Sequence, residues 1–207
     1  MILTYNEFID ADLCLALVEK SKTISASLKT YIAAHATTRQ EYLDTQRESG
    51  HFLDESRGNR TQIFYDREDP LILPIRKKIA ELTGLPIENQ TRPLVTIYNQ
   101  GDQYHNHFDY ISNPGQGGQR LKSLVLYLND DYEGGTTYFI HHKFFVEPKV
   151  GKLLIFDNVK EEFYKFVGDE KFYRNGRDES VYHEALPVRK NSKFVLVLWI
   201  REDVPPI

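Results

Sequence analysis

The 207-residue chain has one cysteine, Cys14, so it cannot form a disulfide within itself. Cys14 lies in an apolar pattern of helical spacing, which predicts a buried small hydrophobic side chain rather than a nucleophile. The sequence also lacks a basic, apolar leader at its start and any run of the roughly 18 apolar residues that span a bilayer. We therefore expect a cytoplasmic protein with no membrane partner.

An excess of positive charge is also missing, because 26 Lys and Arg stand against 30 Asp and Glu, a net charge of -4. This balance gives no electrostatic reason to expect a nucleic-acid partner. Hydrophobic residues make up 41% of the chain, which is ordinary for a globular protein of one domain. We expect a single domain over residues 1–207, with helical support over about 1–90 and a strand-rich core over about 91–203.

Helical signals are concentrated in the first half of the chain. Asp10 can cap a first helix, and a second helix is expected over about residues 27–45. A short amphipathic helix is expected over residues 75–82, since Gly84 follows it and glycine favours the position after a helix end. Residues 60–65 predict a strand between these helices.

Strand signals dominate from residue 93 onward, where short runs of Val, Ile, Leu, Tyr and Phe recur between Gly, Pro, Asn and Asp. The expected strands cover residues 94–98, 103–110, 121–128, 136–140, 144–147, 152–156, 181–188 and 194–200. Such a series with turn signals between its members predicts an antiparallel sandwich or barrel. The predicted fold class is α+β, mainly β, with the helices supporting one face of the sheet.

One short pattern in this region suggests a metal site. His107 and Asp109 are separated by one residue within an expected strand, and alternate residues of a strand point to the same face. His183, far downstream, is the candidate third ligand. Two histidines and one carboxylate on one face form the arrangement of non-haem Fe(II) oxygenases. The His-x-Asp pattern alone is weak, and its alternative is a structural histidine beside a solvated aspartate.

The other histidines fit this site less well. His105 would share the face of His107 in a regular strand, so it is either a histidine that does not bind the metal or a residue that supports the ligands. His141 and His142 fall in a turn-like region and are expected to be exposed.

A basic residue ten positions after His183 is the second clue. Lys193 begins the last expected strand and shares one face with Val195, Val197 and Trp199. A lysine on an apolar face is costly unless it is paired, and a small-molecule carboxylate would be a suitable partner. A solvated lysine at the strand end is the alternative, but the nearby metal pattern favours the first interpretation.

Taken in order, these pieces resemble the prolyl 4-hydroxylase family of Fe(II)/2-oxoglutarate-dependent dioxygenases. The resemblance is carried by the helix and turn of residues 79–86, the motif Tyr98-x-x-Gly101-x-x-Tyr104-x-x-His107-x-Asp109-Tyr110, the segments 126–139 and 148–158, and the closing pattern of His183, Pro187, Val188, Lys193 and Trp199. The resemblance implies a double-stranded β-helix (jelly roll) with supporting N-terminal helices.

The resemblance also implies roles for individual residues. The implied Fe(II) ligands are His107, Asp109 and His183. The residues implied to bind 2-oxoglutarate are Tyr98, Tyr127, Lys193 and Trp199. The implied substrate contacts are Tyr104, Arg60 and Arg120. The implied reaction uses O2, converts 2-oxoglutarate to succinate and CO2, and hydroxylates a prolyl residue in a peptide or protein. Ascorbate is the implied reductant.

Several alternatives stay open at this point. The same oxidation could act on another amino-acid side chain or on a small molecule, and a non-catalytic jelly-roll binding module or a zinc hydrolase would belong to other classes. A zinc hydrolase would leave Lys193 unexplained. The long segment 159–180 is either a lid over the site or a surface insertion. Leu126, Leu128 and Ile155 either wall the cosubstrate pocket or pack in the core.

Overall fold

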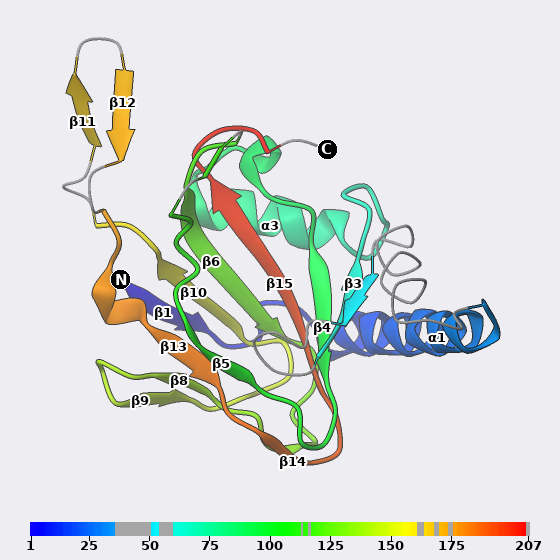
Figure 1. Ribbon diagram of the computed structural model, residues 1–207. Coiled ribbons are helices and arrows are strands. Elements are labelled where there is room, and N and C mark those ends of the chain that lie inside the picture. The colour runs from blue at the N-terminus through cyan, green and yellow to red at the C-terminus, as the bar shows by residue number, and fades with distance from the viewer. Residues whose placement is uncertain are drawn as a thin grey trace.

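The computed structural model describes residues 1–35, 51–53, 60–112, 114–115, 117–160, 164–167, 170–173 and 176–205 (Figure 1). Its larger sheet contains β1 (Ile2–Tyr5), β2 (His51–Leu53), β3 (Thr61–Phe64), β4 (Leu94–Tyr98), β6 (Arg120–Tyr127), β10 (Leu153–Asp157) and β15 (Lys193–Arg201). Its smaller sheet contains β5 (Tyr104–His107), β8 (Thr137–Phe139), β9 (Phe144–Val146) and β13 (His183–Ala185).

Both sheets are antiparallel. The major sheet has the order β1-β10-β6-β15-β4-β3-β2, and the minor sheet has the order β5-β13-β8-β9. Two further strand pairs join β7 (Glu133–Gly134) to β14 (Val188–Lys190), and β11 (Tyr164–Val167) to β12 (Glu170–Tyr173). Short 3-10 helices, η1 (Ile87–Asn89) and η3 (Glu179–Val181), lie in the connections.

The major sheet separates two apolar cores. One core packs α1 (Ala11–His35) and α3 (Leu73–Thr83) against one face, and the other lies between the two sheets (Figure 1). This arrangement confirms the expected jelly roll with helices supporting one face. No helix in the described parts of the chain is long and apolar enough to cross a membrane.

Strand alternation assigns each side chain of β15 to one of these faces. Phe194, Leu196, Leu198 and Ile200 pack in the helix-side core, as does Leu126 of β6. Lys193, Val195, Val197 and Trp199 face the opposite side and line a cavity. The alternation predicted for this strand is therefore confirmed. Leu126, Leu128 and Ile155 are core residues rather than cavity walls, because they project to the helix side.

The helix boundaries differ in part from those expected. The Asp10 carboxylate accepts a hydrogen bond from the Leu13 amide at 2.7 Å, so it caps α1 as predicted. The second helix does not begin at residue 27, because α1 runs without a break through that position; residues 36–45 of the prediction lie outside the described residues. Gly84 ends α3 in the left-handed region, with φ of 66°.

Two strand predictions also need correction. The run 181–188 forms two strands rather than one, because Pro187 has no amide hydrogen for a ladder and the chain leaves the minor sheet there. The expected strand 103–110 ends early, at His107. The β11–β12 hairpin of segment 159–180 points away from both sheets in Figure 1, and no described residue of that segment lines the cavity.

Candidate metal centre and active-site cavity

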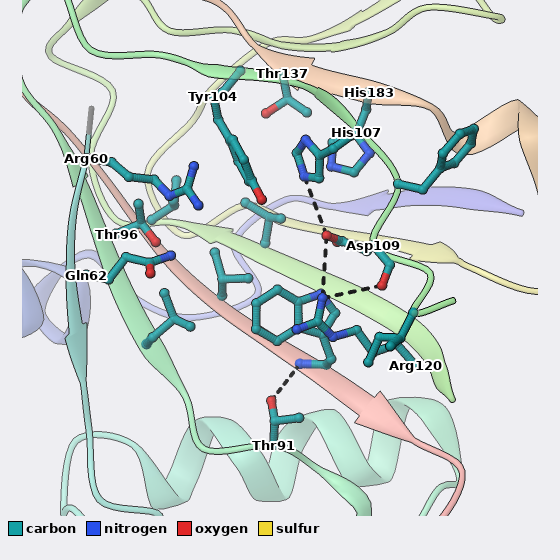
Figure 2. A pocket seen from close by; sticks show the side chains of 18 of the residues that line it. Arg60, Gln62, Thr91, Thr96, Tyr104, His107, Asp109, Arg120, Thr137 and His183 are labelled. Carbon is teal, nitrogen blue, oxygen red and sulfur yellow. Dashed lines mark hydrogen bonds and ion pairs between the residues drawn. The ribbon is translucent and has the colours of Figure 1, made fainter. Parts of the chain in front are cut away.

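The three predicted metal ligands meet between the two sheets. His183 of β13 lies directly opposite His107 of β5 in the strand register, and Asp109 follows β5. The three side chains are buried, and their ligand atoms all lie within 4.8 Å of one another. Figure 2 shows the side chains converging from one side of the cavity. A metal ion can be held by such a group.

An irregularity in β5 decides which histidine faces this site. Ala185 pairs with Tyr104 and His183 with His107, so the register shifts by one residue between them. This β-bulge places Tyr104 and His107, three residues apart, on the cavity side, and it leaves the His105 side chain exposed. The expectation that His105 shares the face of His107 is therefore wrong, because it assumed a regular strand.

Backbone carbonyls fix the orientation of both imidazoles. Nδ1 of His107 lies 2.8 Å from the carbonyl oxygen of His105, and Nδ1 of His183 lies 2.8 Å from that of Val181. A carbonyl can only accept, so each Nδ1 donates and each Nε2 carries the free lone pair. Both rings thus present Nε2 to the centre as a ready metal ligand.

A buried hydroxyl fixes the Asp109 carboxylate. Ser123 donates to Oδ2 of Asp109 at 2.6 Å, and Nδ2 of Asn158 donates to the Ser123 hydroxyl at 2.8 Å. Both supporting residues are buried on strands or strand ends of the major sheet. Oδ1 of Asp109 is left facing His107 Nε2, 3.5 Å away. Sequence reasoning missed this pair, although Ser123 shares the inward face of β6.

The protonation states suit metal binding. Burial, together with the neighbouring His107, lowers the pKa of His183 to about 4. Burial acts to raise the pKa of Asp109, but the hydrogen bond with His107 and the nearby His183 and Arg120 hold that pKa well below its usual range. At neutral pH the centre therefore offers a neutral imidazole and a carboxylate, the forms that bind a metal.

The triad opens into a cavity of about 700 Å³, within the usual size of a small-molecule site. Lys193 lines this cavity with a side chain that is 1% exposed. Its ammonium donates to the carbonyl of Gly135 at 2.6 Å and lies 5.1 Å from the Tyr98 ring centre. Burial lowers the pKa of Lys193 to about 7. A cation so buried fits an anionic ligand in the cavity.

The residues predicted beside this lysine take different places. Tyr98 and Trp199 line the cavity, as expected. Tyr127 is fully buried, does not line the cavity and donates through its hydroxyl to Thr137 at 2.9 Å. Thr137 itself lines the cavity. Tyr127 therefore supports the pocket through Thr137, a residue that sequence reasoning missed.

Two stacked arrangements form the outer walls of the cavity. The Arg60 guanidinium lies 3.4 Å from the Tyr104 ring centre, and the Tyr104 ring stacks on His107 with centres 3.8 Å apart. Opposite them, the Arg120 guanidinium lies 3.7 Å from the Trp199 ring and donates to the Asp109 carbonyl at 3.3 Å. Figure 2 shows Arg60 and Arg120 on opposite sides of the cavity. All three predicted substrate contacts thus line it.

Sequence comparison assigns the chain to a known family. Residues 93–201 match the family model of the 2OG-Fe(II) oxygenase superfamily. A putative prolyl 4-hydroxylase of Acanthamoeba polyphaga mimivirus is 27% identical over 169 residues, covering 77% of this chain and 64% of the relative. Probable prolyl 4-hydroxylase 9 of Arabidopsis thaliana is 25% identical over 219 residues, covering 96% of this chain and 68% of the relative. The chain thus spans about two thirds of each relative.

Solved structures share the fold. The viral collagen prolyl hydroxylase of Paramecium bursaria Chlorella virus 1, solved with 2OG, has a TM-score of 0.67 at 21% identity, covering 97% of this chain and 95% of that one. A prolyl-4-hydroxylase of Pseudomonas putida has a TM-score of 0.60 at 19% identity, covering 97% and 91%. The chain belongs to the 2OG-Fe(II) oxygenase superfamily, with prolyl 4-hydroxylases among its relatives.

Proposed function

We propose that this protein is a prolyl 4-hydroxylase that uses Fe(II) and 2-oxoglutarate and acts on a proline-containing peptide or protein. The observation that carries the proposal is the joint placement of the triad and Lys193. One cavity holds a buried group of two histidines and an aspartate, and it also holds a buried ammonium. An iron ion and a dicarboxylate cosubstrate together satisfy both features.

The donor set fits iron. Two imidazoles and one carboxylate on one side of a cavity are the ligands of non-haem Fe(II) oxygenases. His107, Asp109 and His183 would hold the ion, with Nε2 of each ring already oriented by a backbone carbonyl. Bound Fe(II) supplies the oxidation of 2-oxoglutarate by O2 to succinate and CO2, coupled to hydroxylation of a C–H bond.

The inner cavity fits 2-oxoglutarate. Lys193 would donate a charge-assisted hydrogen bond to the distal carboxylate, and Tyr98 would donate a second from the same wall. Val125, Val195 and Val197 line the same cavity as Lys193 and the triad, so the carbon chain would lie against apolar side chains. These walls would exclude water from the reacting centre.

The outer cavity fits a peptide. Tyr104 and Trp199 present aromatic side chains on opposite walls, and such surfaces suit extended proline-rich segments. Arg60 and Arg120 support these rings and would donate to peptide carbonyls. A proline held between the walls would lie close to the triad, because Tyr104 stacks directly on His107. Ascorbate would keep the iron in its reduced state.

The test is succinate release from the purified protein with Fe(II), ascorbate and 2-oxoglutarate, with and without a panel of proline-containing peptides. Mass spectrometry reads the peptides in parallel. We expect a peptide to stimulate succinate release and to gain one oxygen on proline. Succinate release that no peptide stimulates, with no peptide oxidised, would contradict prolyl hydroxylation and favour the alternative of another amino-acid side chain or a small molecule as substrate.

A further inference from the structure

The cavity wall carries a charge opposite to that of the whole chain. The chain has a net charge of -4. Among the described residues, the basic side chains that line the cavity are Arg60, Arg67, Arg92, Arg120, Arg201 and Lys193. The acidic residues in the same lining are Asp109, a member of the triad, and Glu184. Like charges around a hollow surface reinforce one another and attract ligands of opposite charge.

Three of these arginines have evident structural partners. Arg201 donates to the carbonyl oxygens of Pro114 and Gly118 and so ties the glycine-rich loop after the triad strand to β15. Arg60 and Arg120 stack on the aromatic walls described above. Their positive charge still faces the cavity, but their positions are explained by packing.

Arg67 and Arg92 form a second group in the cavity lining. Arg67 follows β3 and Arg92 precedes β4, so both lie at the same end of two paired strands. Arg92 donates to the backbone carbonyl of Tyr65 at 3.1 Å, and its guanidinium lies 5.6 Å from the Phe64 ring centre. Within the described part of the chain, neither arginine forms an ion pair with a carboxylate. Both retain a charge that a ligand can use.

The nearby acidic residues do not neutralise this pair. Glu68 lies 3.6 Å from Arg76, on the side of α3, and Asp69 pairs with Lys20 of α1. Asp66 is exposed, and Oδ1 of its carboxylate accepts the Glu68 amide. None of these three carboxylates lines the cavity.

We infer, resting on the proposed function, that the substrate is an acidic peptide: a proline-containing segment with Asp or Glu near the target proline, recognised by Arg67 and Arg92. Arginine suits this role because its planar guanidinium can hold a carboxylate through two parallel hydrogen bonds. Arg92 follows Thr91, whose hydroxyl accepts a hydrogen bond from the Trp199 amide at 3.0 Å, so the pair lies beside the Trp199 wall, and a peptide bound across the aromatic walls passes it on leaving the cavity. The arginine pair thus selects for charge beside the proline.

The first experiment compares peptides that share a central proline and differ only in carrying Asp, Asn or Lys on either side. Oxygen gain on proline gives kcat/KM, and fluorescence anisotropy of labelled peptides gives Kd. We expect the Asp peptide to exceed the Asn peptide by about tenfold at low salt and the Lys peptide to be the poorest. The advantage should shrink as salt rises, since exposed charges are screened.

Substitutions of the two arginines test whether they cause the preference for the Asp peptide. Arg67→Gln and Arg92→Gln should each weaken the Asp peptide by about threefold, the size typical of an exposed ion pair, and leave the Asn peptide unchanged. Arg67→Glu should reverse the order of the Asp and Lys peptides. The matched control is Arg189→Gln, which removes the same charge from an exposed position of β14 outside the cavity. Thermal unfolding of each variant establishes that it is folded.

The outcomes separate the two claims. Oxygen gain that is equal for the Asp and Asn peptides would overturn the acidic-substrate inference and leave prolyl hydroxylation standing. If no peptide gains oxygen, the proposed function falls, and the Kd values decide the inference. If the Asp peptide binds more tightly than the Asn peptide and this advantage is lost in Arg67→Gln, the acidic-substrate inference is supported. Equal Kd values for the two peptides would overturn it. An oligonucleotide that displaces the Asp peptide at a lower concentration would also overturn it, in favour of a phosphate ligand.

Discussion

The inner and outer ends of the cavity are built in different ways. At the inner end, His107, Asp109 and His183 are buried and held by hydrogen bonds with short distances, and Lys193 is enclosed beside them. At the outer end, the Arg120 guanidinium stacks on the Trp199 ring, and Arg67 and Arg92 extend from strand ends. The inner end is thus held in one arrangement by short hydrogen bonds, whereas we propose that the side chains of the outer end determine which substrate enters.

The largest expected effect comes from breaking the inner end at its ligands. His183→Ala or Asp109→Ala should lower succinate production by about a thousandfold or more, because each removes a proposed iron ligand. Metal content and 2-oxoglutarate-dependent succinate release measure the effect. His105→Ala is the matched control, since its side chain is exposed and only its backbone carbonyl contacts His107. An equal loss in the control would place the site elsewhere.

The next effect concerns the buried cation. Lys193→Ala should raise the Kd for 2-oxoglutarate by about a hundredfold, the scale of a buried charge-assisted hydrogen bond. Lys190→Ala is the control, because Lys190 is exposed and pairs with the exposed Glu133 at 3.1 Å. Calorimetric titration of both variants with 2-oxoglutarate measures the difference. An unchanged Kd in Lys193→Ala would remove this residue from cosubstrate binding.

A smaller effect should follow from the support behind the ligands. Ser123→Ala removes the hydroxyl that donates to Asp109 Oδ2 and should weaken metal binding by about tenfold, as residues behind metal ligands commonly do. Ser123→Thr keeps a hydroxyl at this position and should restore most of the affinity. Titration of the apoprotein with Co(II) measures this metal affinity directly. Wild-type affinity in Ser123→Ala would show that the carboxylate needs no such support.

The smallest expected effect is a pH dependence. Burial lowers the pKa of Lys193 to about 7, so the free protein loses the ammonium proton as pH rises through that value. A carboxylate ligand binds the protonated form, so Kd for 2-oxoglutarate should rise about fivefold between pH 7 and 8. In Lys193→Arg, the charge persists and the dependence should vanish. A flat profile in the wild type would contradict the role of Lys193 as the titrating partner.

The same pKa shift affects folding of the ligand-free protein. Because the folded-state pKa of Lys193 lies below its ordinary value of 10.5, the unfolded chain binds more protons between those two values. The contribution of this group therefore destabilises the fold at low pH and is relieved as pH rises from about 7 toward 10.5.

Features that depend on strand periodicity could be predicted from sequence. The face shared by Lys193, Val195, Val197 and Trp199 follows from alternation along β15, which pairs regularly with both its neighbours over most of its length. The capping role of Asp10 depends on residues three positions apart, and it was also predictable. Local rules suffice where the structure is regular.

Features that depend on pairing between distant segments could not be predicted in this way. The bulge that turns His105 outward exists only because β5 pairs with β13, about eighty residues away. The hydrogen bonds from Asn158 to Ser123 and from Ser123 to Asp109 join three separate segments. The arginines that line the cavity come from separate segments of the chain, and the net charge of -4 gave no sign that they would gather there.

The most direct test of the account is calorimetric titration of the protein with 2-oxoglutarate under anaerobic conditions, with Fe(II) and again with a chelator. We expect tight binding with Fe(II), a large loss of affinity when the metal is removed, and a similar loss in His183→Ala and Lys193→Ala. Binding that is equally tight without metal, or that survives both substitutions, would contradict the claim that the triad and Lys193 form one cosubstrate site.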